Sequence, residues 1–470
     1  MKRRDFLKTG SLAALGGMLL TPFGAKANTI KEEFRGRKAK NIIFMVSDGM
    51  SVGTMIMADI YLKRKNGKSS NWVGLYEDNL VQRALMDMAS ANAIVTDSAA
   101  ASSSWGGGVR VNNGSLNVSP NGKENMPILQ KFKKAGKKVG CVTTVPITHA
   151  TPAGFCVTSK RRNAMDHIAE QYAELNFDVM MGGGSQYFDK DKRKDKKDVF
   201  DLFTKKGYTI AKTKSEMLSA PKNKPILGTF DEDAVPYTVD HLRDEKASRN
   251  IPSLAEMAQK AIDQMKDHKN GFALQIEGGK VDWAAHGNDI AALLFDQIAF
   301  DEAVKVVMDF AKKDKNTLVV ITSDHGNANP GLIYGGKTND NFDHLQKFTH
   351  SNDWILQGIH ASSSTSFVKD RIAEACGGFA ITDEQAKELL SYYNNLKKED
   401  GLYNHKNLPF RALAEMQKAY TSVGWISMDH SSDYTELAMY GPGSENLKSF
   451  FRNTDMHNFL LNAAHVENKF

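Results

Sequence analysis

Uninterrupted apolar runs of strand length recur along the chain, separated by segments with helical periodicity. The first is 41–47, NIIFMVS, whose lack of polar alternation is typical of a strand buried on both faces of a parallel sheet. Similar runs lie at 139–145, 177–181, 272–276, 317–323 and 436–440. Strands of this kind that alternate with helices predict an α/β fold, with a large, mostly parallel central sheet and helices on both faces.

Two of the intervening segments carry clear helix signals. Ser253 and Glu256 have the spacing of a capping box, which predicts a helix running to about Lys269. A second helix is predicted at 289–313, where apolar side chains recur at helical spacing.

Two stretches do not fit this alternation. Residues 330–424 have weaker periodicity, apart from a candidate helix at 382–397, and predict a crown-like or lid-like insertion that partly covers the functional site. The mixed-charge run at 189–198 predicts a solvated loop. Because the sequence has no internal repeat or long linker, we expect residues 28–470 to form a single domain that includes the insertion.

The N-terminus has the features of an export signal. Arg3 and Arg4 precede the apolar stretch 12–20, which is shorter than the about 20 residues that a membrane-spanning helix needs. An Ala-Lys-Ala cleavage pattern ends at residue 27. Residues 1–27 therefore resemble a twin-arginine (Tat) signal, which predicts a periplasmic or secreted protein without a membrane anchor in the mature chain. The alternative is a short membrane anchor.

Charge and cysteine content exclude other classes. The formal net charge is +6, but residues 1–27 hold five basic residues against one acidic residue, so the mature chain carries only +2. A nearly neutral protein gives no electrostatic reason to expect nucleic-acid binding. The three cysteines are too few for a disulfide framework, although any two could pair outside the cytoplasm. They are Cys141, Cys156 and Cys376.

Polar and ionisable residues follow the predicted strands. The carboxyl ends of parallel strands meet at one edge of a sheet, where open sheets of this type bind ligands. Each residue alone could be a turn residue or a helix cap, but together they predict a functional site. These residues are Asp48, His149, Thr151, Glu277, Asp324 and His325.

The segment that follows Glu277 is the densest in potential metal ligands. Asp282 and His286 are four residues apart, so one helical turn places both on the same face. Such a pair can share a metal ion, and the alternative is a surface ion pair. His430, in a polar segment, is a further candidate. Carboxylate and imidazole ligands suit zinc, whereas oxygen-only ligands suit magnesium.

Ser98 is the candidate nucleophile. It begins the small-residue segment SAAASSS, and backbone N–H groups at a helix start favour an anion such as phosphate. It could instead be the helix N-cap. The sequence has no G-x-S-x-G elbow and no general base next to Ser98, so a metal ion is the expected activator.

Together, these segments resemble the alkaline phosphatase family. The nucleophile segment and the E-x₄-D-x₃-H pattern that begins at Glu277 are the most specific. The matching pieces, in the family's order, are 41–50, 95–116, 148–155, 276–289, 321–326, 424–434 and 438–443. The resemblance implies an alkaline phosphatase-like catalytic domain that hydrolyses small-molecule phosphate monoesters through a phosphoserine at Ser98. It also implies two zinc ions (Zn²⁺), one magnesium ion (Mg²⁺) and a homodimer.

The resemblance implies a role for each candidate residue. The first zinc site matches Asp282, His286 and His430. The second zinc site, next to the nucleophile, matches Asp48, Asp324 and His325. The magnesium site matches Asp48, Thr151 and Glu277. Arg162 matches the phosphate-binding arginine, and Asp97 is expected to orient Arg162 or Ser98.

At two positions the members of the family that this chain resembles carry different residues. His149 stands where some members have aspartate and others histidine, and the histidine type implies a different magnesium environment and weaker magnesium binding. Trp283 stands where some members have a lysine that reaches phosphate through water. Its presence implies that Arg162, the metals and the backbone hold phosphate, with faster release.

Alternative functions are a phosphodiesterase or sulfatase of the same superfamily and, from another class, a secreted phosphate- or metal-binding protein without turnover. None of the cysteines, nor Ser98, has the C-x-P-x-R context that is typical of a sulfatase. Diesterases often use threonine and lack the arginine that Arg162 matches. A binding protein would hold phosphate tightly and release no product.

Overall fold

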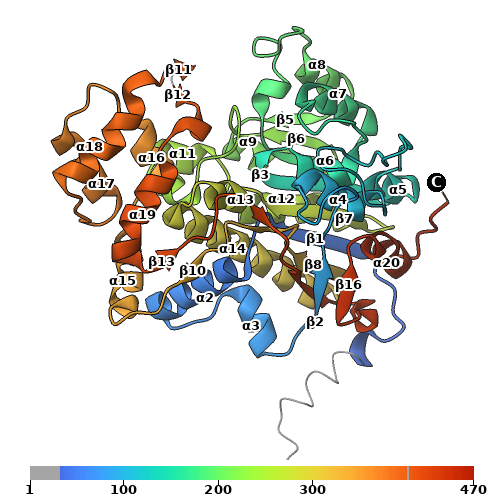
Figure 1. Ribbon diagram of the computed structural model, residues 1–470. Coiled ribbons are helices and arrows are strands. Elements are labelled where there is room, and N and C mark those ends of the chain that lie inside the picture. Colours follow the sequence, from blue (N-terminus) through green and yellow to red (C-terminus); the bar gives the residue numbers. More distant parts are fainter. Residues whose placement is uncertain (1–31, 400–401, 470) are drawn as a thin grey trace, which may run out of the picture.

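The computed structural model describes residues 32–399 and 402–469, so the predicted export signal lies outside the described residues. A ten-stranded sheet forms the centre, in the order β16-β2-β15-β8-β1-β7-β3-β4-β6-β5 (Figure 1). Six strands coincide with the predicted runs: β1 (Asn41–Ser47), β3 (Lys138–Pro146), β4 (Val179–Gly183), β7 (Phe272–Gly278), β8 (Thr317–Thr322) and β15 (Thr435–Tyr440). The other four are β2 (Gln82–Asp87), β5 (Thr209–Ala211), β6 (Ile226–Thr229) and β16 (Phe450–Arg452).

The sheet is mostly parallel, as predicted. All pairs from β8 across to β5 are parallel, whereas β15 runs antiparallel to both β8 and β2. In the central register, Val46 of β1 lies opposite Glu277 of β7 and Thr322 of β8. The residues that follow these three strands therefore leave the sheet at the same edge.

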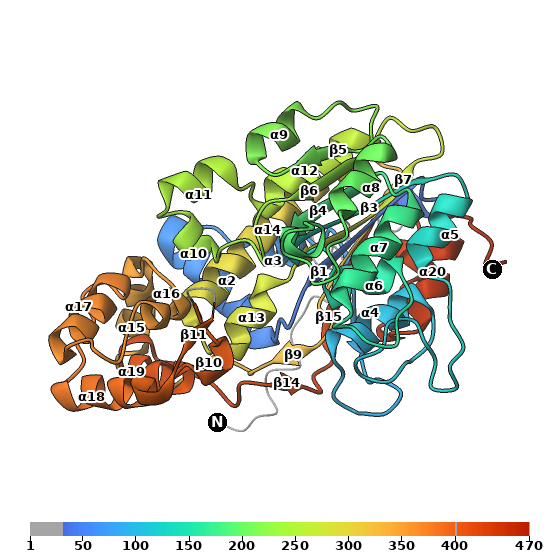
Figure 2. The same cartoon turned by 90° about the horizontal axis from the view of Figure 1, so that it is seen from above.

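Helices cover both faces of the sheet (Figure 2), and every residue of β1 is buried. One face carries α2 (Val52–Asn66), α3 (Asn71–Glu77), α10 (Thr238–His241), α12 (Leu254–Met265), α13 (Lys280–His286) and α14 (Ile290–Asp314). The other carries α4 (Ser98–Gly106), α5 (Ile128–Lys134), α6 (Ala150–Cys156), α7 (Met165–Leu175), α8 (Val199–Lys205) and α20 (Asp455–Ala463). The short helices α9 (Lys214–Ser219) and α11 (Glu245–Asn250) lie between α8 and α12 in the chain.

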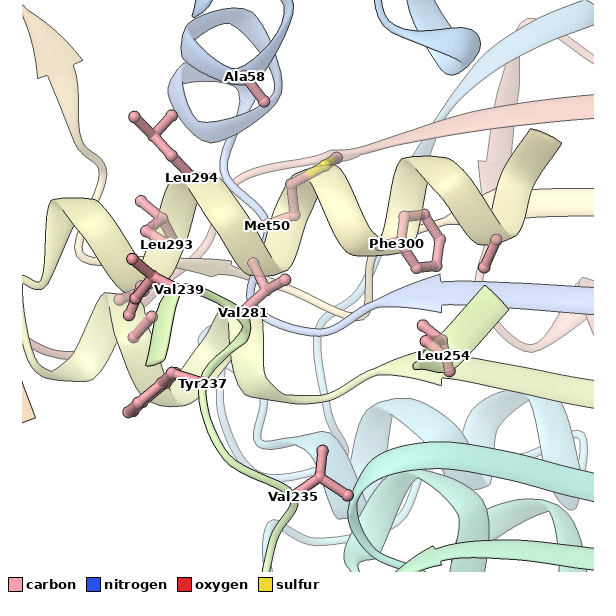
Figure 3. Close-up of a cluster of buried hydrophobic side chains, with 14 of the residues drawn as sticks. Met50, Ala58, Val235, Tyr237, Val239, Leu254, Val281, Leu293, Leu294 and Phe300 are labelled. Atoms are coloured by element: carbon pink, nitrogen blue, oxygen red, sulfur yellow. The ribbon is translucent and has the colours of Figure 1, made fainter. Parts of the chain in front are cut away.

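The two predicted helices are present as α12 and α14. Ser253 and Glu256 form the capping box at the start of α12. Leu293, Leu294 and Phe300 of α14 belong to the larger buried apolar cluster, part of which is shown in Figure 3. Because these helices follow β6 and β7 in the chain, they connect parallel strands across one face.

The predicted insertion is mainly helical and gathers to one side of the sheet (Figure 1). The candidate helix at 382–397 is present as α18, which Thr382 caps, followed by a 3-10 turn. The strands β10 (Gly331–Leu332) and β13 (Val423–Gly424) pair at its base, so the chain leaves and re-enters the core at one place. Its helices are α15 (Thr338–His344), α16 (Asn352–Gln357), α17 (Thr365–Ala375), α18 (Asp383–Ser391) and α19 (Phe410–Thr421).

The run at 189–198 is a largely exposed loop, as predicted, except at Arg193. The side chain of Arg193 is fully buried and forms ion pairs with Asp166, Glu170 and Asp195. It also donates to the backbone carbonyls of Asp166 and Tyr187. The prediction of a solvated segment is therefore wrong for this residue, because acidic groups and carbonyls replace the water around its guanidinium.

No helix within residues 32–399 and 402–469 has the length and apolar character needed to cross a membrane.

Candidate functional site

Three carboxylates meet where β1, β7 and β8 end. Asp48, Glu277 and Asp324 are fully buried. One oxygen of each lacks a hydrogen-bond partner among the described residues: Asp48 Oδ1, Glu277 Oε1 and Asp324 Oδ2. Buried and unbonded carboxylate oxygens are costly unless a cation compensates them.

The electrostatics of these carboxylates also favour a cation. Burial, followed by repulsion from Asp324, raises the pKa of Asp48 well above its usual range. Burial likewise raises the pKa of Glu277 to about 7 and that of Asp324 to about 6. A divalent ion reverses this effect because it stabilises the charged form of every carboxylate around it.

Asp282 and His286 lie one turn apart on α13, as their spacing predicts. His286 Nε2 is 3.4 Å from Asp282 Oδ2 and 3.1 Å from His430 Nε2. His430 comes from β14 (His430–Ser431), which pairs with β9 (Gly326–Asn327) just after β8. Asp282, His286 and His430 thus form a compact group able to hold one metal ion.

The three histidines of the predicted zinc sites share one orientation. Each Nδ1 lies within hydrogen-bonding distance of a backbone carbonyl, and because a carbonyl only accepts, Nδ1 must carry the proton. The pairs are His286 with Met428 at 2.6 Å, His430 with Thr96 at 2.9 Å and His325 with Gly326 at 3.3 Å. Each Nε2 therefore has a free lone pair directed into the site, which is the tautomer that binds zinc.

A second potential ligand group lies beside the first and contains Asp48, Asp282 and His325. Asp324 adjoins it, since its Oδ2 is 3.2 Å from His325 Nε2. The rings of His325 and His430 stack at 3.6 Å, so the two groups are neighbours. Every residue that the sequence predicts for the two zinc sites is thus brought together.

A third group contains Asp48, His149 and Glu277. Thr151 joins it by donating a hydrogen bond of 3.1 Å from Oγ1 to Asp48 Oδ2. Burial, and then the charge of Arg162, lowers the pKa of His149 to about 3, so this imidazole is neutral. A nitrogen donor thus lies next to the oxygen ligands predicted for magnesium.

Ser98 lies at the start of α4, with its hydroxyl next to the second group. Its Oγ is 3.3 Å from His325 Nε2, and the side chain is almost fully buried. The alternative that Ser98 is the helix N-cap is wrong, because Asp97 caps α4 by accepting from the backbone N–H of Ala100. The hydroxyl of Ser98 is therefore available for chemistry.

Asp97 also fixes Arg162. Its Oδ2 accepts from Arg162 Nη1 at 3.0 Å and from the backbone N–H of Gly114 at 2.9 Å. Arg162 Nη2 lies 3.3 Å from His149 Nε2, and the ring of Trp283 stands edge-on to His149 at 6.0 Å. These contacts place the predicted anion-binding arginine between the nucleophile helix and the third group.

Asn327 is a site residue that the sequence reasoning missed. It is fully buried, and its Nδ2 donates to Asp282 Oδ1 at 2.7 Å and to the backbone carbonyl of Asp282 at 3.2 Å. It therefore orients a carboxylate shared by two groups. Its position three residues after Asp324, at the same strand end, was the available signal.

Comparisons with known proteins agree with this arrangement. The alkaline phosphatase family model matches residues 39–466. Alkaline phosphatase 4 of Bacillus subtilis (strain 168) is 31% identical, over 90% of this chain and 88% of its own length. Alkaline phosphatase of Escherichia coli (strain K12) is 29% identical, over 70% of this chain and 82% of its own. The crystal structure of Thermus thermophilus alkaline phosphatase superposes with a TM-score of 0.85 at 30% identity, over 95% and 96% of the two chains.

Proposed function

The chain belongs to the alkaline phosphatase family and is a metal-dependent hydrolase of phosphate monoesters, and we propose that Ser98 is its nucleophile. The observation that carries this proposal is the 3.3 Å separation between Ser98 Oγ and His325 Nε2. The buried hydroxyl of Ser98, which does not cap α4, therefore lies at a helix N-terminus beside the atoms that could hold a metal ion.

The metal sites are the next part of the proposal. Zinc fits the first group and the second group with Asp324, because free imidazole nitrogens and carboxylates converge there. Magnesium fits the position between Asp48, Thr151 and Glu277, because all three offer oxygen, and Asp48 Oδ1 and Glu277 Oε1 lack hydrogen-bond partners among the described residues. When bound, the ions would lower the pKa of the Ser98 hydroxyl and neutralise the charge on the leaving oxygen.

His149 should weaken the binding of magnesium by the third group. An imidazole is a poor ligand for magnesium and a good one for zinc, and His149 belongs to the same group as Asp48 and Glu277. We therefore propose that magnesium is retained less tightly here than it would be with an aspartate at this position.

The chain's own residues then carry out two displacements. Ser98 Oγ attacks phosphorus, the ester oxygen leaves as the alcohol, and the phosphoryl group remains on Ser98. Water then attacks the same phosphorus, releasing inorganic phosphate and restoring the hydroxyl. The planar fork of Arg162 would hold two non-bridging oxygens in both steps, and its bond to Asp97 fixes that fork in place.

The direct test is to trap the intermediate. The metal-loaded protein is mixed with p-nitrophenyl phosphate and quenched in acid, and its peptides are analysed by mass spectrometry. We expect phosphate on Ser98, in the peptide containing residues 95–106. Turnover with no phosphorylated residue, or with phosphate elsewhere, would overturn the assignment of the nucleophile.

We also propose that the protein is exported from the cytoplasm. The twin-arginine pattern of residues 1–27 supports export to the periplasm or the medium, with no anchor in the mature chain. Cell fractionation tests this, because replacing Arg3 and Arg4 by lysine should leave the activity in the cytoplasm. Activity that remains exported in the double variant would contradict the proposal.

A homodimer is the last part of the proposal. Val52 and Ile56 of α2, with Ile333, Tyr334 and Ile426, expose apolar side chains on adjoining elements. A second copy would remove this surface from water. Light scattering of the purified protein should give twice the mass of one chain, whereas Ile56→Arg should shift the equilibrium toward the monomer. The predicted substrates remain small phosphate monoesters, with no nucleic-acid partner.

A further inference from the structure

Two of the three cysteines approach each other closely in the interior. Cys141 lies in the middle of β3, and Cys156 is the last residue of α6. Their Sγ atoms are 3.4 Å apart, and both side chains are fully buried. Cys376 lies apart from them in the insertion, where Gln417 donates to its Sγ.

We propose that Cys141 and Cys156 form a disulfide that links α6 covalently to the central sheet. A disulfide has a sulfur–sulfur distance of about 2.05 Å, so side-chain rotation must close a gap of about 1.4 Å. The backbone next to Cys156 is already fixed, since Asn117 Nδ2 donates to the carbonyls of Gly154 and Val157. The thiols are therefore paired by the fold before any bond forms.

The chemistry requires an external oxidant, for which we name a small-molecule disulfide. One cysteine thiolate attacks it and releases one external thiol, giving a mixed disulfide. The second cysteine thiolate then displaces the other external thiol, so two protein thiols and one external disulfide become one protein disulfide and two external thiols. The two protons leave with the external thiols.

Burial determines when this exchange occurs. Burial in apolar surroundings raises the pKa of the Cys141 thiol, and the thiolate is the reactive form. Exchange in the folded protein is therefore slow, and it proceeds through local openings in which α6 moves away from β3. Once formed, it is protected from reductants by the same packing.

The bond would close a loop that carries two site residues. Residues 141–156 include His149 and Thr151, both of which lie at or near the start of α6. The nucleophile helix α4 rests on α6 through the bond from Ser102 Oγ to the Ala150 carbonyl. The cross-link should therefore stabilise the scaffold beneath the site without touching the substrate.

The experiment uses the full-length, metal-loaded protein. It is unfolded and refolded with either oxidised glutathione or dithiothreitol, then denatured, alkylated and mapped by mass spectrometry. We expect one alkylated cysteine, Cys376, after oxidation and three after reduction, with a Cys141–Cys156 peptide pair in the oxidised sample. Three free thiols after oxidation, or a bond that includes Cys376, would overturn the proposal.

The stability readout has a matched control. Oxidised wild type should have a melting temperature several degrees above the reduced form, with a similar kcat. The difference should vanish in Cys141→Ala and Cys156→Ala but persist in Cys376→Ala, which removes the third buried cysteine. Equal melting temperatures for the oxidised and reduced wild type would refute the stabilising role of the disulfide. This comparison does not depend on whether any variant folds.

Discussion

The Nε2 atoms of His286 and His430 face each other at 3.1 Å, while the Nδ1 of each imidazole is bonded to a backbone carbonyl. Two lone pairs at that separation repel unless a cation lies between them. This relationship ties the stability of the site to metal binding and leads to the first prediction.

Removal of divalent ions with a chelator should abolish hydrolysis of p-nitrophenyl phosphate, and addition of zinc with magnesium should restore it. His430→Asn should lower the zinc content, measured by atomic emission, and reduce kcat/KM by about a thousandfold or more. His350→Asn is the control, since that histidine belongs to none of the three groups and stacks on Trp354. Full activity without bound metal would refute the mechanism.

Ser98→Ala should reduce kcat by at least about a thousandfold, because the attacking oxygen is lost while the rest of the site remains. The zinc content should be unchanged, since no ligand is removed. Ser104→Ala is the matched control in the same helix, because its hydroxyl donates to the helix carbonyl of Ala101 and lies in none of the three ligand groups. Near-wild-type turnover of the Ser98 variant would exclude it as nucleophile.

Asn327→Leu should weaken zinc binding about 10- to 100-fold, because Asp282 loses the amide that orients its carboxylate. At saturating zinc, kcat should recover most of its value, whereas a role in the chemical step would keep it low. Zinc titration followed by activity at each concentration separates the two outcomes. An unchanged zinc affinity would mean that the hydrogen bond from Asn327 does not contribute to zinc binding by Asp282.

Asp296 should make stability depend on pH. Burial raises its pKa to about 7, so the folded state favours the protonated form, and this contribution is lost as pH rises through about 7. Asp296→Asn keeps an oxygen for the backbone N–H of Thr238 and cannot ionise. Relative to wild type, the variant should gain about 1–2 kcal/mol between pH 6 and pH 9. A constant difference in denaturant unfolding across this range would contradict the prediction.

Gln275→Met should be neutral or stabilising by about 1–3 kcal/mol. The side chain of Gln275 is fully buried in β7, and neither its amide nitrogen nor its oxygen has a hydrogen-bond partner among the described residues. Gln297→Met is the contrasting control. Gln297 accepts a hydrogen bond from Ser47 Oγ at 2.7 Å, so this variant should lower the free energy of unfolding. Urea unfolding of the two variants decides between these outcomes.

The fold was largely predictable because its central strands are buried on both faces. β1 and β7 are buried along their whole length, and their apolar runs stand out in the sequence. β2 was not found, because it alternates between buried and exposed positions, and β5 has only three residues. The buried Arg193 was missed because its partners on α7 are distant in the sequence.

The candidate site was predictable to the extent that strand ends converge. Asp48, Glu277 and Asp324 lie at the ends of adjacent parallel strands, so their proximity follows from the sheet. His430 and Ser98 come from other elements, and only the family resemblance links them to these carboxylates. Asn327 lies in a two-residue strand that has no periodic signal, and its contact with Asp282 depends on how α13 packs. The pairing of Cys141 with Cys156 depends likewise on how α6 lies against β3.

Asp48 and Asp282 each belong to two of the three ligand groups. Neighbouring positions that share a carboxylate are thermodynamically linked, because an ion at one fixes the charge and orientation of the ligand for the next. We therefore expect occupancy of the first and second groups, which share Asp282, to be cooperative, while the third group holds its ion less tightly. Activity would then fall at a threshold concentration of zinc, and not gradually as two independent ions are lost.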